Sequence, residues 1–334
     1  MLRSELEQFH LYPFLHMKKI TVTFQCRLTS SGVFSAYKGS MLRGSLGTFL
    51  KKTCCTMHRQ SCEDCILVNN CAFPILFMGK RNTKKGSLSL IPPYCIHVTD
   101  TGKTLYSTGE LFIFNITLFS YAIDYLPYFA HAFILAGNKG MGKGTENKNG
   151  TFDIEDIIYQ NQSIFHKNKQ QIDIPKGEML VLPYWETSRF GMGSLLVHIK
   201  TPCRFKADNH LSADLSFRQL FQLIVRRIRS VWAMDEENVM FDNFSAMLNR
   251  ADGIQTIENC LYWKDWTRYS SRQKSSMQLG GILGSVRYYG DLAAFLPFFI
   301  LAEQLNIGKQ TSFGLGEISF EWMPNEKNSD SFVR

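Results

Sequence analysis

The sequence predicts an α+β protein made of two tandem ferredoxin-like domains. A chain of 334 residues is long enough for two domains. Each half runs in the order strand, helix, strands, helix, glycine-rich loop and strand, which is the order of a split βαβ unit used twice. The apolar fraction of 45% is ordinary for domains with hydrophobic cores. We expect an N-terminal domain over residues 1–180 and a C-terminal domain over 181–334.

The first half shows alternation where strands are expected and a 3.6-residue period where helices are expected. Ile20, Val22 and Phe24 alternate with polar residues, which indicates a half-buried strand. Further strands are predicted over 90–97, 111–119 and 151–158, and helices over 40–52 and 124–136.

The second half repeats this pattern after a polar stretch, residues 160–178, that is typical of a linker or exposed loop. Apolar residues from Phe217 to Trp232 follow the helical period and predict an amphipathic helix. A second helix is predicted over 291–306, and strands over 195–199, 286–289 and 317–322.

Charge and cysteine content indicate which partners and which cellular compartment to expect. The net charge of +8 favours an anionic partner. No apolar run reaches the eighteen or so residues of a membrane span, so no membrane partner is expected. The first residues carry acids where an export signal needs basic and then apolar residues. Together with nine cysteines, this predicts reduced thiols and a cytoplasmic protein.

A glycine-rich loop, Gly308–Gly316, lies between the last predicted helix and the last predicted strand. Glycine lets the backbone approach a ligand closely and adopt conformations closed to other residues. Lys309 adds positive charge, and loop N–H groups can bind anionic oxygens. The loop is therefore predicted to cradle a phosphate backbone.

Four cysteines within seventeen residues, Cys55, Cys62, Cys65 and Cys71, suggest a metal site. Tetrahedral zinc takes four such ligands, and a C-x2-C pair supplies two of them on one turn. We expect a structural zinc here, with Cys54 as an alternative to Cys55. Another metal, or free thiols, is the competing interpretation.

Five segments in the same order resemble the CRISPR-associated repeat-RNA processing endoribonucleases of the RAMP superfamily, over roughly residues 18–322. They are Leu42–Gly47, the cysteine-rich segment, Lys200–Phe205, Arg268–Gln273 and the C-terminal run from Gly280 to Gly316.

The resemblance implies two RRM-like domains and a glycine-rich loop that holds CRISPR repeat RNA. It implies cleavage of the precursor CRISPR transcript within each repeat, without a catalytic metal or other cofactor. The 2′-hydroxyl attacks the phosphate, leaving a 2′,3′-cyclic phosphate and a 5′-hydroxyl. Related RAMP proteins hold crRNA without cutting it, in effector complexes with other proteins, so a non-catalytic binding subunit is the alternative.

The cleavage chemistry needs a base, an acid and a cation near the phosphate. Many relatives place a His, a Tyr and a Lys near the first helix, and here His58, Tyr37 and Lys52 are the candidates, with His58 as general base. Several relatives carry a histidine where this chain has Thr48, and a surface or metal-adjacent role for His58 stays open. The remaining histidines lack an equally suggestive setting; they are His10, His16, His97, His131, His166, His198 and His210.

The resemblance also favours RNA contact for basic residues near aromatic ones, since guanidinium groups bind phosphates and aromatic rings stack on bases. A solvated loop, or a salt bridge in the case of Arg204, is the competing interpretation. The predicted RNA-binding residues are Arg204, Arg268, Arg272, Lys274, Gly308, Lys309, Thr311, Ser312, Phe313, Gly314, Leu315 and Gly316.

Overall fold

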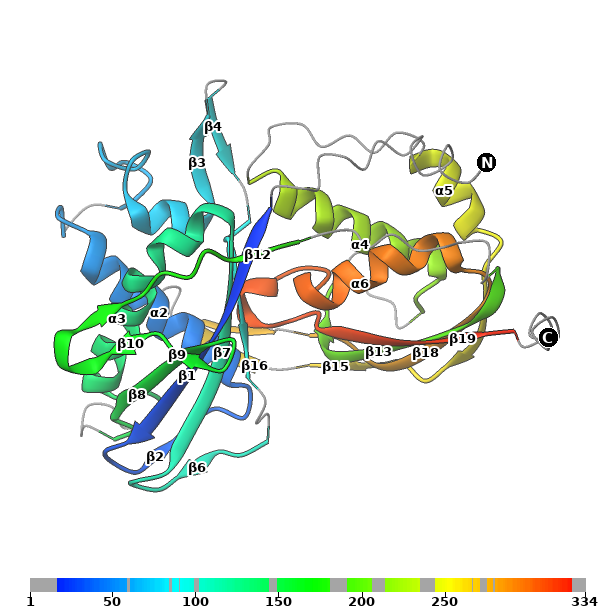
Figure 1. The fold of residues 1–334 in the computed structure, drawn as a ribbon. Coiled ribbons are helices and arrows are strands. Elements are labelled where there is room, and N and C mark those ends of the chain that lie inside the picture. Colours follow the sequence, from blue (N-terminus) through cyan, green and yellow to red (C-terminus); the bar gives the residue numbers. More distant parts are fainter. Residues whose placement is uncertain are drawn as a thin grey trace, which may run out of the picture.

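Two α+β domains lie side by side in the computed structural model (Figure 1). Residues 17–180 build one antiparallel sheet and residues 191–325 build the other. The structure describes residues 17–58, 61–83, 86–89, 91–98, 102–143, 149–180, 191–205, 214–234, 244–265, 267–270, 275–278 and 280–325.

The N-terminal sheet has the strand order β5-β7-β1-β8-β9, with β12 also paired to β1. Its central strand buries alternate residues, among them Ile20, Val22 and Phe24, because side chains alternate across the pleat. The strands are β1 (Lys18–Leu28), β5 (Tyr94–His97), β7 (Leu111–Phe119), β8 (Phe152–Tyr159), β9 (Gln162–Ser163) and β12 (Glu178–Met179).

Two helices cover one face of this sheet (Figure 1), namely α2 (Lys38–Cys54) and α3 (Leu126–Lys139). Leu42, Leu46 and Leu50 are fully buried because they recur every four residues on one side of α2. The opposite face carries polar side chains of β1 and β7. It is this polar face that looks toward the second domain.

Shorter elements complete the N-terminal domain. They are β2 (Gly32–Val33), β3 (Lys80–Thr83), β4 (Gly86–Ser89), β6 (Leu105–Tyr106), β10 (Phe165–His166), β11 (Gln171–Ile172), the π-helical turn η2 (Pro74–Met78) and the 3-10 turns η3 (Ser120–Tyr125) and η5 (Lys167–Lys169).

The C-terminal sheet has the strand order β14-β18-β13-β19, with β15 also paired to β18. Helices α4 and α6 pack on one face of this sheet. Its elements are β13 (Met192–Cys203), α4 (Phe217–Trp232), α5 (Phe244–Ala251), β14 (Gln255–Asn259), β15 (Tyr262–Lys264), the hairpin β16 (Thr267–Ser270) and β17 (Ser275–Gln278), β18 (Gly281–Asp291), η7 (Ala293–Phe295), α6 (Leu296–Leu305), η8 (Thr311–Phe313) and β19 (Ile318–Pro324).

Helix α4 spans the residues that the sequence pattern predicts, because its start is strongly marked. The Ser216 hydroxyl accepts from the Gln219 N–H, and the Gln219 side chain reaches back to the Ser216 N–H, which is a capping box. Leu220, Ile224 and Ile228 are fully buried on the sheet side.

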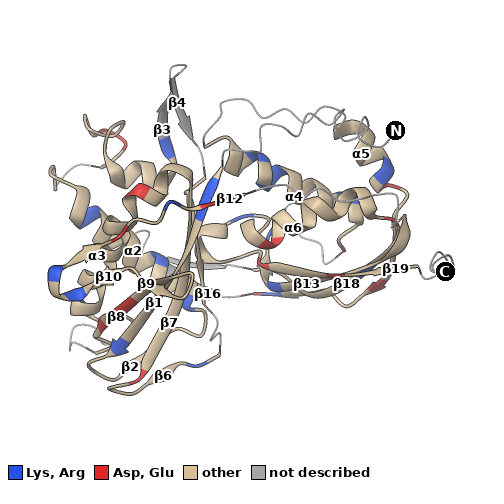
Figure 2. Ribbon diagram, viewed as in Figure 1, with Lys and Arg blue, Asp and Glu red and all other residues tan. Residues whose placement is uncertain are grey.

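Both domains place their four main strands in the same spatial order. If those strands are numbered along the chain, each sheet reads 2-3-1-4, with one helix after strand 1 and one after strand 3. This is the ferredoxin-like arrangement, so the predicted fold class is confirmed. Lys and Arg occur on both domains with acids interspersed (Figure 2), and no helix in the described residues is long and apolar enough to cross a membrane.

Candidate functional site

The glycine-rich loop packs against the N-terminal domain. Its 3-10 turn η8 contacts helix α2 and strand β5. Gly314 has φ +82°, a conformation that favours glycine, and a Cβ there would collide with the Ile96 carbonyl oxygen. The glycine is therefore needed for close approach of the loop to β5.

Helix α2 holds this loop from the other side. The Tyr37 hydroxyl, just before the helix, donates to the Phe313 carbonyl oxygen. Arg43 Nε donates to Ser312 Oγ at 3.0 Å. The Arg43 guanidinium carbon lies 4.3 Å from the ring centroids of both Phe77 and Phe313, so the cation is held between one ring from each domain.

These contacts correct the prediction that the loop is an open phosphate cradle. Its residues Thr311, Ser312, Phe313, Gly314, Leu315 and Gly316 are all buried in the docked structure and so are closed to RNA. Gly314 faces the N-terminal domain, whereas Gly316 packs against Ile307 of its own domain. The close backbone approach that glycine permits is made to protein carbonyls instead. Only the outer end of the loop, with exposed Lys309 and half-buried Gly308, stays available.

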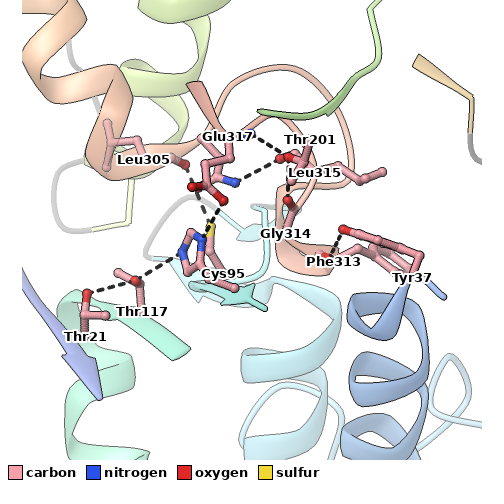
Figure 3. A network of polar contacts seen from close by, with 12 residues as sticks. Thr21, Tyr37, Cys95, Thr117, Thr201, Leu305, Phe313, Gly314, Leu315 and Glu317 are labelled. Atoms are coloured by element: carbon pink, nitrogen blue, oxygen red, sulfur yellow. Dashed lines mark hydrogen bonds and ion pairs between the residues drawn. The ribbon is translucent and has the colours of Figure 1, made fainter. Parts of the chain in front are cut away.

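A chain of polar contacts runs from the loop to the space between the two sheets (Figure 3). Thr201 Oγ1 donates to the Gly314 carbonyl at 2.8 Å and accepts from the Glu317 N–H at 2.8 Å. The Glu317 carboxylate lies 3.8 Å from His97 Nδ1. His97 Nε2 lies 3.4 Å from Thr117 Oγ1.

These residues line a pocket of about 490 Å³ to which both domains contribute. The N-terminal sheet provides its polar face, and the C-terminal domain provides residues of β13 and α6 and Glu317, which directly precedes β19. The lining residues are Lys19, Thr21, His97, Val98, Asn115, Thr117, Lys200, Thr201, Glu303, Gln304 and Glu317.

The pocket combines cations with unused hydrogen-bonding capacity. Burial lowers the pKa of the Lys19 ammonium, although nearby Glu178 opposes this. The contact with His97 lowers the pKa of Glu317, and the charge of Lys200 acts in the same direction. Partial burial opposes this shift. Asn115 Oδ1 is buried and has no hydrogen-bond partner among the described residues. A ligand with both anionic and hydrogen-bonding groups fits this lining.

The three predicted catalytic residues do not form one site. Tyr37 precedes the 17-residue helix α2 and Lys52 lies in its last turn, so about 22 Å of helix axis separates them. Burial raises the pKa of Tyr37 far above its usual range, and its hydroxyl is engaged with the loop. His58 is exposed, beyond the end of the helix. Tyr37 therefore has a structural role here.

The cysteine-rich segment gathers its thiols, since burial, with Cys55, Cys71 and Cys65 close by, raises the pKa of Cys62. Among the described residues, no group of three or more Cys, His, Asp or Glu side chains is placed to hold a metal ion, so the zinc prediction for Cys55, Cys62, Cys65 and Cys71 is not supported. The Cys71 thiol points to the Cys54 carbonyl at 4.0 Å. Burial and the nearby Cys71 and Cys55 raise the pKa of Cys54 to about 11. All nine cysteines are free thiols.

Of the other predicted RNA-binding residues, the structure describes Arg204 fully and Arg268 by its backbone alone. Arg204 follows β13 and is half-buried, and its carbonyl accepts from the Lys309 N–H at 2.9 Å. The backbone of Arg268 lies on β16, while its side chain, Arg272 and Lys274 lie outside the described part. Their contacts with RNA stay predictions.

The pocket residues were missed by the sequence interpretation, although a signal existed. Lys19 and Thr21 occupy the polar face of a strand that was predicted correctly, and His97 ends another. Pairing the polar faces of the predicted strands would have placed His97 beside Asn115, as the register does. The pocket residues of the C-terminal domain, among them Lys200 and Glu317, have no such signal in the sequence.

Comparison with known proteins agrees with this two-domain organisation. Residues 15–176 match the family model AF_1859_N, an N-terminal domain, and residues 197–318 match that of the CRISPR-associated endoribonuclease Cas6. An uncharacterised protein of Archaeoglobus fulgidus is 26% identical over 148 residues, which are 42% of this chain and 49% of that protein.

Solved structures share the fold at low sequence identity. A partial Cas6-RT-Cas1–Cas2 complex superposes with a TM-score of 0.54 at 11% identity, over 93% of this chain and 47% of that one. A Cas6-RT-Cas1–Cas2 complex gives the same TM-score and identity over 93% of this chain and 30% of that one. The chain thus spans about half the length, or less, of these relatives. The C-terminal domain of the chain, over residues 197–318, is thus similar to the CRISPR-associated Cas6 endoribonucleases.

Proposed function

We propose that this protein cleaves precursor CRISPR RNA within its repeats by attack of a 2′-hydroxyl on the adjacent phosphate. The observation that carries the proposal is the match of residues 197–318 to the Cas6 endoribonuclease model. The products would be a 2′,3′-cyclic phosphate and a 5′-hydroxyl. Repeat RNA would be the partner, bound by the basic chain through the polar pocket between the sheets.

The proposed reaction uses side chains rather than a metal ion to move protons and to hold the phosphate. A nucleophile that is already part of the RNA needs only a base, an acid and positive charge around it. Histidine and lysine side chains of the pocket supply these groups.

Purified protein incubated with end-labelled repeat RNA in excess EDTA is expected to give a single cut. The 5′ product should carry a cyclic phosphate, identified by mass and by its resistance to phosphatase until acid opens the ring. A repeat with a 2′-deoxy nucleotide at the cleavage position is the matched control, and it should bind but stay intact. Cleavage of that control, or a requirement for added metal, would contradict the mechanism.

A non-catalytic crRNA-binding subunit of an effector complex is the second candidate. It is favoured by Thr48, which stands where several relatives carry a histidine. The Thr48 hydroxyl donates to the Gly44 carbonyl of its own helix at 3.1 Å, and a threonine is no acid–base group near neutral pH. Tight binding of repeat RNA with no cut in the same assay would favour this candidate.

A further inference from the structure

The pocket between the sheets holds a histidine whose two ring nitrogens face different partners. Nδ1 lies 3.8 Å from the Glu317 carboxylate, which comes from the other domain. Among the described residues, Nε2 has a long contact of 3.4 Å with Thr117 Oγ1. A carboxylate beside one nitrogen orients the ring and leaves the other nitrogen to exchange a proton.

We propose that His97 is the proton acceptor of the RNA cleavage reaction, and that the pocket seats the nucleotide whose 2′-hydroxyl attacks. This assignment rests on the proposed function and deepens it. Ligand pockets are typically about 300–1,000 Å³, and the 490 Å³ of this one can hold a nucleotide. The His97 side chain is 20% exposed, so a ligand in the pocket can reach it.

The charged groups around His97 suit a phosphodiester. Lys19 and Lys200 bring positive charge from opposite domains, and Glu317 and Glu303 are the acids of the lining. Glu303 Oε1 already accepts from the Phe320 N–H at 3.1 Å, which ties it to the sheet edge. The buried Asn115 Oδ1, without a partner in the described residues, can accept from a ribose hydroxyl or a base N–H.

The reaction step balances with these groups and water. His97 Nε2 takes the proton of the 2′-hydroxyl as the 2′-oxygen forms its bond to phosphorus. The bond from phosphorus to the 5′-oxygen breaks, and that oxygen takes a proton from water. The hydroxide formed is neutralised by the proton on His97, so the enzyme returns to its starting state. Lys19 and Lys200 offset the charge that gathers on the phosphate oxygens.

His97→Ala tests the assignment in the full-length protein with repeat RNA under single-turnover conditions. The cleavage rate is expected to fall by roughly 10²- to 10⁴-fold, while the dissociation constant for the 2′-deoxy repeat stays within about twofold, since the lysines still bind the phosphates. His97→Gln keeps a polar side chain of similar size and is the second variant, for the case that the alanine variant does not fold. It should be as slow, because an amide does not take up a proton near neutral pH.

Two histidine variants complete the design. His166→Ala is the matched control, because His166 also pairs with a carboxylate, Asp173 at 2.8 Å, but outside the pocket. His166→Ala is expected to cleave at the wild-type rate, and His58→Ala tests the rival base.

Each outcome decides the matter. Wild-type cleavage by His97→Ala or His97→Gln overturns the assignment, and so does a loss that appears in His58→Ala instead. A loss of RNA affinity that accounts for the slower cleavage would make His97 a binding residue and also overturn it. If the wild-type protein does not cut repeat RNA at all, the proposed function itself fails, which the parallel EDTA assay reports separately.

Discussion

Gly314→Ala is expected to destabilise the docked arrangement of the two domains strongly, because this glycine of the loop packs directly on the N-terminal domain. Gly314 has φ +82°, and its added methyl group would collide with the Ile96 carbonyl of the N-terminal domain. The left-handed conformation alone costs a non-glycine residue about 1–2 kcal/mol. With the collision, we expect a loss of about 3–5 kcal/mol in the free energy of unfolding.

The measurement is urea unfolding followed by far-UV circular dichroism, with Gly109→Ala as the matched variant. Gly109 has nearly the same φ, +83°, but among the described residues no atom lies within 4 Å of an added Cβ. Gly109→Ala therefore reports the conformational cost alone. Equal losses in the two variants would mean that close approach of Gly314 to β5 contributes nothing to stability.

Arg43→Ala is expected to have the second largest effect. It removes a cation held between Phe77 and Phe313 and the hydrogen bond from Nε to Ser312. Each cation–π contact contributes about 0.5–2 kcal/mol depending on burial, so we expect unfolding to become easier by about 2–4 kcal/mol. Cleavage should slow as well, because the loop that Arg43 holds leads to Glu317 through Thr201.

Two further variants give this prediction its controls. Arg43→Lys keeps the charge but loses the planar group that stacks on both rings, so it should recover less than half of the lost stability. Arg226→Ala removes an exposed arginine of α4 and should change the melting temperature little. An Arg43→Ala protein with the wild-type melting temperature would show that the loop is held without this residue.

The regular elements could be predicted because their patterns are local. The helix from Phe217 to Trp232 has a capping box at one end and a continuous apolar stripe, so both its bounds and its buried face follow from the sequence. The strands around Val22 and Ile116 alternate, and their pairing follows from the split βαβ order.

Local patterns misled where two elements meet. The helix predicted from residue 291 begins later, because Asp291 ends β18 and pairs with Arg250 at 3.1 Å, and α6 begins at Leu296 after a 3-10 turn. Pro297 therefore lies in the first helical turn, where its missing N–H costs nothing. The polar stretch 160–178 contains short strands, the last of which pairs with Lys18 and Lys19.

The candidate site could not be predicted because it is made by docking. His97 and Glu317 are far apart in the chain and meet only when the domains are side by side. The glycine loop shows the same limit, since three glycines predict close backbone approach but not what is approached. Here the partners are carbonyls of Ile96 and Ile307 rather than phosphates. Tyr37 and Lys52 lie at opposite ends of the 17-residue helix α2, so nearness along the chain does not bring them together.

The pocket is lined by residues of both domains, so a ligand bound in it contacts both domains at once. Such a ligand binds only when the two domains are docked. At a concentration of a hundred times its dissociation constant, it adds about 2.7 kcal/mol to the free energy of unfolding. Ligand binding and the stability of the docked domains are therefore thermodynamically linked. A short oligonucleotide that fits the pocket should raise the melting temperature of the protein even when it is not cleaved.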